Sequence, residues 1–432
     1  MTARENSVQG EPGHGLFSGE YMDLPENERY GNFLNGKRVI VAVTGSISIY
    51  RTPDIIRGLR KEGAEVKVVI SSEAAELVGS KVFQWASGNE VIADITGKVE
   101  HVSEFDGDPS SKVMAVIPAT YNFIGKAASG IADDPPSLFF SFAHGNGNRV
   151  LLSPTMHEAM LYNPAVQKNL EFLQNNGVEV IPPRIEEGKA KIEDNDTVID
   201  WVCRVSGSYI LKGKTVLILG GKSSEEIDSV RSITNGSTGL TALWIARNAF
   251  RLGSEKIVYI GNSSYSLPSY VHHISANSSD EFESRGLESI GLYNPDIILV
   301  PASISDFKIS SPTNGKLEGG QEIDIKLVPR PKIIARIRKR TRSIIVGFKL
   351  SASRDSDPKK IEDLLKICDM VVVNDLAGGK KPFGPGSNSY TIHGGPETVR
   401  STMSKQDLSL TILEMAGIKM EEKAYEGYNG SE

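Results

Sequence analysis

Short apolar runs alternate with amphipathic stretches along most of the chain. Runs of this length that end at Gly, Pro, Ser or Thr are typical of strands buried on both faces of a sheet. They predict strands at 39–43, 66–70, 113–117, 149–153, 178–181, 216–219, 256–260, 296–301, 343–347 and 370–373. Helical spacing of apolar residues predicts helices at 53–61, 120–129, 164–175 and 240–250. The repeated strand-helix-strand order predicts an α/β protein with mainly parallel sheets and right-handed crossovers.

A chain of 432 residues exceeds one typical hydrophobic core. We therefore expect two Rossmann-like, three-layer domains, over residues 35–205 and 206–418. Residues 1–34 are rich in Gly, Glu, Asn and Pro, which predicts a loosely ordered N-terminal arm. Residues 419–432 are polar and are expected to form a frayed tail.

The composition narrows the class of partner. The hydrophobic content of 39%, the charged content of 24% and the net charge of -6 predict a globular protein without a bias toward nucleic acid or anionic membrane. Cys203 and Cys368 lack the spacing of a disulfide or zinc site, which favours core thiols in a reducing cytoplasm. No apolar run has membrane-spanning length, and the N-terminus lacks the order of a signal peptide. We expect small-molecule partners.

Polar residues gather where strands of the first half end. Because ligands of α/β folds bind at the carboxyl ends of strands, three such loops are expected to converge: 44–47, 118–122 and 154–160. Thr120 is placed to cap the helix that runs through Ser129, and small residues on this helix would admit a flat ring. The turn at Gly45 has one glycine where a dinucleotide fingerprint needs three, so a mononucleotide phosphate fits better.

His101 and the segment 185–196 of the first half each allow two interpretations. His101 precedes the strand at 113–117; a lone histidine is more often structural, but imidazole also suits proton transfer near neutral pH. Residues 185–196 are dense in charge and fit either a solvated linker or a mobile lid.

The second half opens with an unusually long connection. About eighteen polar residues separate the strand at 216–219 from the helix at 240–250, where ordinary connections take about two to six. Ser237 or Thr238 is expected to cap this helix, and amides at such a helix start bind anions. The connection is therefore predicted to be a binding loop.

Charged residues follow the strand at 296–301. Asp306, Lys308 and Lys316 offer both signs of charge, which a triphosphate and its metal ion need, although a surface ion pair would look the same. No Gly-x4-Gly-Lys-Ser/Thr loop occurs in the sequence, so the ordinary P-loop is excluded.

Two sets of motifs carry a family resemblance. The first is Gly45-Ser-Ile, His101-Val, Pro118-Ala-Thr-x-Asn through Asp134, and Pro154-x-Met156. The second is Glu226-Ile-Asp-x-Val-Arg-x-Ile-Thr-Asn-x-Ser-x-Gly239, with Asp306, Lys316, Pro331, Gly347-Phe348 and Asn374-Asp375. Over residues 37–417 the chain resembles the bifunctional coenzyme A biosynthesis proteins, in which phosphopantothenoylcysteine decarboxylase is fused to phosphopantothenate–cysteine ligase. It looks similar to archaeal members.

For the first domain the resemblance implies an FMN-dependent decarboxylase. The flavin oxidises the cysteine side-chain carbon to a thioaldehyde and returns the hydride after carbon dioxide leaves. His101 is the implied acid/base, and Asn122, Met156 and His157 are implied to hold the substrate. The implied FMN-binding residues are Gly45, Ser46, Ile47, Ser71, Pro118, Ala119, Thr120 and Lys126.

The chain departs from the family pattern at two places. His157 stands where many members have a substrate-binding asparagine, and it can still donate a hydrogen bond. The lid segment 188–191 lacks the cysteine that supplies the last proton in the family, so Lys189, Lys191 or water would have to serve. A protein that binds flavin without turnover is therefore the alternative. A dehydrogenase with two NAD-binding domains is disfavoured by the missing glycines.

For the second domain the resemblance implies activation of 4′-phosphopantothenate by CTP and magnesium to an acyl-cytidylate, which the cysteine amine attacks. ATP in place of CTP stays open, as do the metal ligands. Asn235 and Arg231 are implied to address the activated carboxylate, and Lys316 and Lys366 the phosphates. The implied nucleotide-binding residues are Val300, Pro301, Ala302, Asp306, Pro331, Lys332, Ile333, Ile334 and Phe348. A homo-oligomer with trimeric decarboxylase contacts and dimeric ligase contacts is implied as well.

Overall fold

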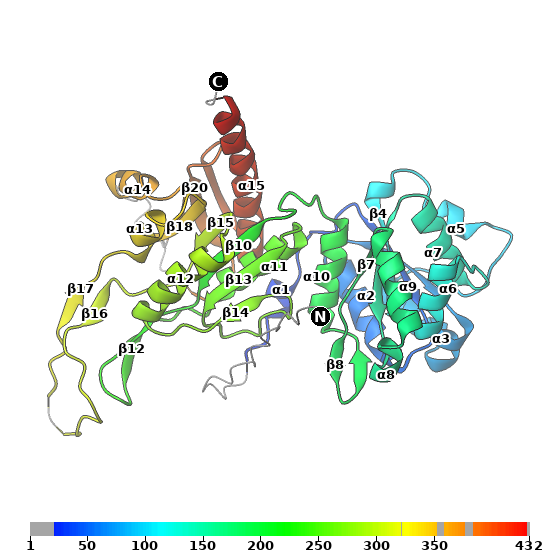
Figure 1. Ribbon diagram of the computed structural model, residues 1–432, viewed down its shortest axis with the longest axis horizontal. Coiled ribbons are helices and arrows are strands. Elements are labelled where there is room, and N and C mark those ends of the chain that lie inside the picture. Colours follow the sequence, from blue (N-terminus) through cyan, green and yellow to red (C-terminus); the bar gives the residue numbers. More distant parts are fainter. Residues whose placement is uncertain (1–20, 321, 352–357, 376–382, 430–432) are drawn as a thin grey trace, which may run out of the picture.

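The computed structural model describes residues 21–320, 322–351, 358–375 and 383–429. It contains two α/β domains side by side, each built around one large sheet with helices on both faces (Figure 1). The predicted fold class is thereby confirmed. Among the described residues, no helix combines the length and the apolar character that crossing a bilayer requires.

The first domain is built on a six-stranded, wholly parallel sheet in the order β3-β2-β1-β4-β5-β7. Alternate residues of β1 point to opposite faces, so Val39 and Val41 pack with one set of helices and Ile40 and Ala42 with another. The strands are β1 (Arg38–Val43), β2 (Glu65–Ile70), β3 (Val91–Ile92), β4 (Lys112–Ala119), β5 (Arg149–Pro154) and β7 (Val178–Val180). One face carries α2 (Thr52–Lys61), α3 (Ser72–Leu77), α4 (Ser80–Ser87) and α10 (Asn195–Ser206); the other carries α6 (Tyr121–Ser129), α7 (Pro135–Gly145), α8 (Glu158–Leu161) and α9 (Pro164–Asn175). The short helices η1 (Ile47–Arg51), α5 (Glu100–Ser103) and η2 (Pro109–Ser111) lie in connections.

The second domain has an eight-stranded sheet in the order β14-β13-β10-β15-β18-β19-β20-β21. Its last two strands are antiparallel and were not predicted, because their alternating polar positions lack a continuous apolar run. The strands are β10 (Thr215–Gly220), β13 (Lys256–Gly261), β14 (His272–Ile274), β15 (Ile297–Val300), β18 (Ile344–Ser351), β19 (Met370–Asp375), β20 (Asn388–His393) and β21 (Val399–Met403). Helices α11 (Leu240–Arg251) and α15 (Lys405–Asn429) cover one face, and α12 (Ser279–Tyr293), α13 (Ile333–Arg338) and α14 (Pro358–Leu365) the other.

Both sheets share one topological feature. In each, the first strand of the domain lies in the middle, and the chain winds outward from it first to one side and then to the other. The strand order therefore reverses between β1 and β4 and between β10 and β15. Loops diverge at such a switch point and leave a crevice at the carboxyl ends of the strands, where ligands bind.

Three hairpins project from the sheets. The charged segment predicted as a linker or a lid forms β8 (Arg184–Glu186) and β9 (Lys189–Lys191), and β9 also pairs with β6 (Met156–His157). It is thus an ordered hairpin rather than a linker. The long connection after β10 contains β11 (Ser224–Glu226) and β12 (Ser232–Thr234). Strands β16 (Phe307–Ile309) and β17 (Leu327–Pro329) form another arm (Figure 1).

Both ends of the chain differ from the expectation. Residues 1–20 of the expected loose arm lie outside the described residues, but 21–34 are packed: they contain α1 (Glu26–Arg29), and Glu28 and Leu34 are buried. The expected frayed tail from residue 419 continues helix α15 to Asn429. Lys419 Nζ donates to Gly394 O at 2.6 Å, and Lys423 pairs with Asp369. Tertiary contacts order these polar segments where composition alone predicts none.

The joint between the domains is a buried charge cluster where α10 packs against α11. Asp200 accepts hydrogen bonds from Arg247 at 2.9 Å, from Arg251 at 2.8 Å and from the Tyr270 hydroxyl at 2.6 Å. Arg251 also pairs with Glu62 of the first domain at 2.8 Å. Burial alone would raise the pKa of Asp200, but the two guanidiniums outweigh it and hold that pKa below its usual range.

The two cysteines lie in separate cores. Cys203 and Cys368 are both free and buried, which confirms the prediction of core thiols. Burial raises the pKa of Cys368 to about 11. Neither thiol therefore forms a thiolate easily at neutral pH.

Candidate active sites

The first site is a cavity of about 390 Å³ at the carboxyl ends of the parallel strands of the first domain. It brings together residues of the three predicted loops, and Ser71 and Glu73 after β2 join them. Predicted site residues that line it are Gly45, Ser46, Ser71, Thr120, Asn122, Met156 and His157; Thr44, Glu73, Tyr121, Phe123, Asp134, Thr155 and Met160 line it as well.

Hydroxyl groups form the floor of this cavity and hold one another in place. Thr44 Oγ1 donates to Pro118 O at 2.8 Å and accepts the Thr120 N–H at 3.1 Å. Thr155 Oγ1 donates to Ser46 Oγ at 3.0 Å. Thr120 caps α6 by accepting the Phe123 N–H at 3.3 Å, as predicted. Hydroxyls beside a helix N-terminus are suited to an anionic group such as a phosphate.

Gly45 makes close packing possible at the end of β1. A Cβ added there would lie 2.6 Å from the Cβ of Glu73, which is too close for any other residue without a shift. The Glu73 backbone N–H and the Ser71 hydroxyl hold the pKa of the Glu73 carboxyl below its usual range. The turn therefore packs directly against the start of α3.

Several predicted residues lie outside this cavity in a single chain. Ile47 is 76% exposed, and Pro118 and Ala119 belong to β4 beneath the floor. Lys126 pairs with Asp133 at 2.6 Å and with the cavity residue Asp134 at 2.8 Å. The His101 ring packs edge-on against Phe142, with 5.7 Å between ring centroids.

The hairpin of β8 and β9 is paired to β6, in the loop that was predicted to hold the substrate. Met156 pairs with Ala190 and His157 with Lys189. Lys191 Nζ donates to Glu186 and Glu187 at 3.1 Å each, and these hydrogen bonds raise its pKa. Lys191 is therefore a poorer proton donor at neutral pH than an unpaired lysine.

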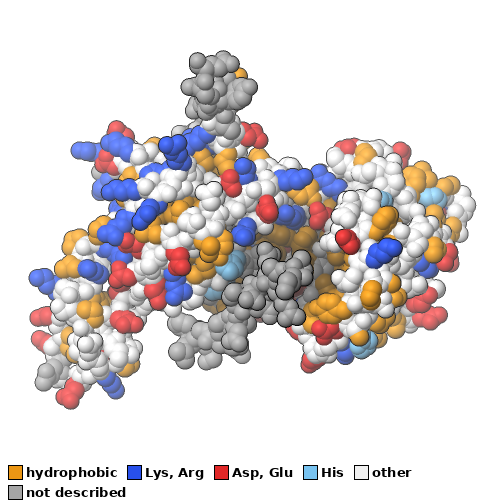
Figure 2. Space-filling view, in the orientation of Figure 1, with side chains coloured by type: hydrophobic (Ala, Val, Ile, Leu, Met, Phe, Trp, Pro, Cys, Tyr) orange, Lys and Arg blue, Asp and Glu red, His pale blue; other side chains and the backbone are white. Residues whose placement is uncertain are grey.

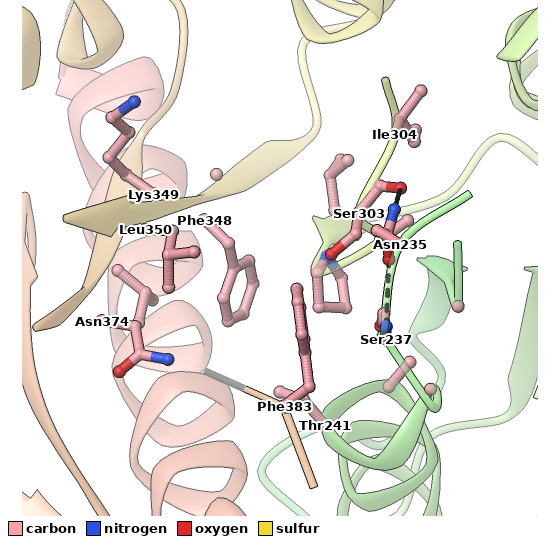
Figure 3. A pocket seen from close by; sticks show the side chains of 18 of the residues that line it. Asn235, Ser237, Thr241, Ser303, Ile304, Phe348, Lys349, Leu350, Asn374 and Phe383 are labelled. Carbon is pink, nitrogen blue, oxygen red and sulfur yellow. Dashed lines mark hydrogen bonds between the residues drawn. The ribbon is translucent and has the colours of Figure 1, made fainter. Parts of the chain in front are cut away.

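The second site is a cavity of about 400 Å³ in the second domain (Figure 3). It lies at the switch point between β10 and β15 and reaches across β18 and β19. Predicted residues that line it are Asn235, Val300, Pro301, Ala302, Asp306, Pro331, Lys332, Ile333, Ile334 and Phe348.

Asn235 is held in a fixed orientation at the edge of the second cavity. Its Nδ2 donates to Ser303 O at 2.8 Å, and its Oδ1 accepts the Ser237 N–H at 3.0 Å (Figure 3). A primary amide carries two N–H donors, so one remains for a ligand. The loop after β12 and the loop after β15 thus position each other.

The start of α11 differs from the predicted capping. Neither Ser237 nor Thr238 caps the helix; Gly239 occupies the N-cap position with φ +80° and offers no side chain. A left-handed conformation favours glycine, and a Cβ there would lie 3.0 Å from the Tyr259 hydroxyl. The first turn of α11 lines the cavity, so its uncapped amides are available to an anion.

Other residues of this cavity escaped the sequence-based prediction. Tyr390 and Lys405 lie on β20 and at the start of α15, and no local motif marks them. Asn374 stood in a recognised motif, but no site was predicted on it, and Phe383 belonged to neither motif set. The lining residues outside the prediction include Thr241, Ser303, Lys349, Asn374, Phe383, Gly384, Tyr390 and Lys405.

Three predicted residues of the second domain lie outside the cavity. Arg231 and Lys316 belong to the projecting hairpins, where Arg231 donates to Leu317 O at 3.1 Å. Backbone N–H groups of Leu317, Val230 and Arg231 hold the pKa of Asp228 below its usual range and tie the hairpins together. The Lys366 side chain is 64% exposed and donates to Asp363 at 2.9 Å.

A basic surface lies beside the second cavity. Figure 2 shows Lys and Arg side chains gathered over the part of the domain that carries α13 and α14. Lys332 of the cavity, Lys339, Arg340 and Arg342 are exposed on and around α13, whereas Arg336 and Arg338 pair with Glu283 and Asp369. Despite the net charge of -6, this region would attract an anionic ligand.

The ligand chemistry of the second cavity fits a metal ion carried in by a substrate. Among the described residues, no group of three His, Cys, Asp or Glu side chains could hold a metal ion. Asp306 offers one carboxylate at the cavity. Magnesium typically binds through one or two carboxylates together with substrate phosphates, so these residues fit that arrangement.

Comparison with known proteins agrees with this architecture. Residues 27–207 match the flavoprotein family, and residues 211–418 match the C-terminal domain family of DNA/pantothenate metabolism flavoproteins. The two cavities lie one in each matched region. Fold, sites and family models together define a two-domain flavoprotein of pantothenate metabolism.

Curated relatives narrow this class. The coenzyme A biosynthesis bifunctional protein CoaBC of Thermococcus kodakarensis is 34% identical over 84% of this chain and 90% of its own length. The CoaBC protein of Methanocaldococcus jannaschii is 32% identical over 88% and 93%, and that of Haemophilus influenzae 30% over 80% and 88%. The chain belongs to the CoaBC family of bifunctional coenzyme A biosynthesis enzymes, with a decarboxylase domain followed by a ligase domain. The resemblance predicted from its motifs is confirmed.

Proposed function

We propose that the second domain joins cysteine to 4′-phosphopantothenate and that the first domain decarboxylates the product, 4′-phosphopantothenoylcysteine, to 4′-phosphopantetheine. The observation that carries the proposal is one chain with two cavities at equivalent switch points, a hydroxyl-lined one in the flavoprotein domain and one beside a basic surface in the ligase domain. The proposal includes that the protein lies in the cytoplasm, together with its small-molecule substrates.

In the ligase reaction, a carboxylate oxygen of 4′-phosphopantothenate attacks the α-phosphorus of CTP and pyrophosphate leaves. The cysteine amine then attacks the acyl carbon of the acyl-cytidylate, and CMP leaves. Val300 to Ala302 and Pro331 to Ile334 would hold the nucleotide, with Phe348 beside it. Asp306 would hold magnesium together with the phosphates.

Asn235 is the residue proposed to act on the acyl group. Its free N–H can donate to the carbonyl oxygen, where negative charge develops when the cysteine amine attacks the acyl carbon. A neutral amide does this without repelling the incoming amine. Because its other contacts to Ser303 and Ser237 hold it in place, little reorganisation is needed.

FMN, when bound, supplies the reversible two-electron oxidation of the substrate's thiol-bearing carbon. Gly45, Ser46, Ser71 and Thr120 would hold its phosphate side. Asn122, Met156 and His157 would orient the substrate. Lys189 or water would deliver the last proton, since Lys191 is engaged by two carboxylates.

A homo-oligomer is part of the proposal. In one chain the first cavity lacks His101, and the exposed Ile47 and Tyr50 lie on η1, which directly follows the cavity residue Ser46. The hairpins that carry Arg231 and Lys316 expose apolar side chains, among them Val230, Phe307 and Leu327. Trimeric contacts at the first domain and dimeric contacts at the second would cover these residues and bring the missing groups to a neighbouring cavity.

The test is a coupled assay on purified protein with 4′-phosphopantothenate, cysteine, magnesium and CTP or ATP. Pyrophosphate and carbon dioxide are measured separately, and the flavin is measured by its absorbance. Release of both products supports the proposal. Pyrophosphate alone would mean that the first domain binds flavin without turnover, and release of neither would refute the proposal.

A further inference from the structure

The segment 21–34, here called the strap, runs from the ligase domain to the decarboxylase domain. Its Met22 N–H donates to Ser264 O at 2.8 Å, and Leu24 packs against a cluster that contains Trp244 of α11. At the other end the Leu34 N–H donates to Glu62 O at 2.9 Å, and its side chain is fully buried in the first core. Helix α1 lies between these anchors (Figure 1). No predicted site residue falls on the strap.

In the middle of the strap, the Glu28 carboxylate forms a hydrogen bond to the ligase domain. Glu28 is 5% exposed, and its Oε1 accepts the N–H of Gly386. From the opposite side, Lys405 Nζ donates to the carbonyl of the same residue at 3.3 Å. Gly386 is therefore held at both its N–H and its C=O by side chains of opposite charge.

Lys405 lies where a cation is least stable. Its side chain is buried, and it is the first residue of α15, where the helix dipole disfavours positive charge. Burial lowers its pKa, and the nearby Glu28 opposes that shift. A cation in such a place needs a counter-charge, and Glu28 supplies it from the other end of the chain.

Gly386 lies in a loop that forms part of the wall of the ligase cavity. Gly386 lies in the loop Phe383–Asn388, and Phe383, Gly384 and Lys405 all line the cavity. Gly384 and Gly386 have φ values of +97° and +105°, so this backbone is intrinsically adaptable. The Phe383 ring lies 3.3 Å from where a Cβ on Gly236 would be, next to Asn235 (Figure 3).

We propose that Glu28 is a positioning residue of the ligase site: with Lys405 it fixes the Phe383–Asn388 loop as the wall that seats the acyl substrate, so the strap completes the ligase site. This inference rests on the proposed ligase function. The loop adjoins Asn235, whereas Val300 and Pro331 of the proposed nucleotide site belong to other elements. Loosening the loop should therefore affect 4′-phosphopantothenate more than CTP.

The experiment compares Glu28→Ala with the matched control Glu26→Ala in the full-length protein. Glu26 is on the same helix, but its side chain is 79% exposed and pairs with Lys61. Loss of one charged hydrogen bond predicts a rise of about tenfold in the KM for 4′-phosphopantothenate in Glu28→Ala, with kcat and the KM for CTP changed less than about twofold. Glu28→Gln keeps an acceptor oxygen and is expected to lie between Glu28→Ala and the wild type.

Two further readouts separate this role from a general loss of structure. Decarboxylation of supplied 4′-phosphopantothenoylcysteine should stay at the wild-type rate in Glu28→Ala. Lys405→Met removes the hydrogen bond to the Gly386 carbonyl and should also raise the KM for 4′-phosphopantothenate. This variant serves as the test if Glu28→Ala does not fold. The inference is wrong if Glu28→Ala behaves like Glu26→Ala, or if both KM values and kcat worsen together. A wild-type protein without ligase activity would instead refute the proposed function.

Discussion

The two cavities occupy equivalent places in two sheets whose first six strands follow the same order, yet different parts of the chain form their walls. The first is walled by short loops directly at the ends of β1, β2, β4 and β5, and its predicted acid/base His101 lies elsewhere. The second draws walls from β12, β15, β18, β19, β20 and α15, which span most of the domain's sequence. The first cavity is therefore built from local loops at the strand ends, whereas the ligase cavity depends on segments that lie far apart in the sequence.

The charge cluster at the joint tests whether the two sites depend on each other. Asp200→Asn would leave Arg247 and Arg251 buried without a full counter-charge, which typically costs about 3–5 kcal/mol. We expect the free energy of unfolding in urea to fall by that amount and both activities to be lost at a lower temperature. Asp196→Asn on the same helix breaks a partly exposed pair with Arg29 and should cost less than about 1 kcal/mol. Equal effects of the two changes would argue against the cluster as the joint.

Asn235→Ala should separate the sites by activity. Loss of a donor to the developing charge typically lowers kcat about 10²–10³-fold, or about 2.7–4 kcal/mol. Pyrophosphate release should fall by that factor, while decarboxylation of supplied 4′-phosphopantothenoylcysteine should be unchanged. A proportional loss of both reactions would indicate that the change disturbs the whole protein.

Ser46→Asp should act on the first site alone. The new carboxylate lies at the start of η1, where it can still accept the Ser48 N–H, but it would repel the flavin phosphate. We expect flavin affinity to fall at least about tenfold, about 1.4 kcal/mol, with ligase activity unaffected. Ser46→Asn is the neutral control of the same size and should retain the yellow flavin absorbance. If both variants lose flavin equally, size rather than charge decides.

The smallest expected effect is the pH dependence of stability that comes from titration of the Asp200 carboxyl in the charge cluster between the domains. The pKa of Asp200 is lowered on folding from an unfolded value of about 3.9, so its stabilisation is complete above that pH and is lost as pH falls through the folded pKa. The stability difference between the wild type and Asp200→Asn should be constant from about pH 7 to 5 and shrink below about pH 4. Urea unfolding at several pH values measures it; a difference that grows on acidification would contradict the assigned direction.

Ten strands of the two main sheets could be predicted from the sequence, because each is a continuous apolar run, and so could most strand-end residues, because turns and caps are local chemistry. Thr120 capping α6 and the convergence of Gly45, Asn122 and Met156 follow from such local signals. Motif order also determined the family. The antiparallel strands β20 and β21 were not predicted, because their sequences contain no continuous apolar run.

Which distant segments meet could be seen only once the chain was folded. The Asp200 cluster joins Glu62, Arg247 and Arg251, and nothing local distinguishes these charges from solvated ones. Likewise Lys405 looks like any polar helix start until Glu28, far away in sequence, is seen beside it. Burial and partner choice depend on how α10, α11 and the strap pack, and periodicity carries no information about that packing.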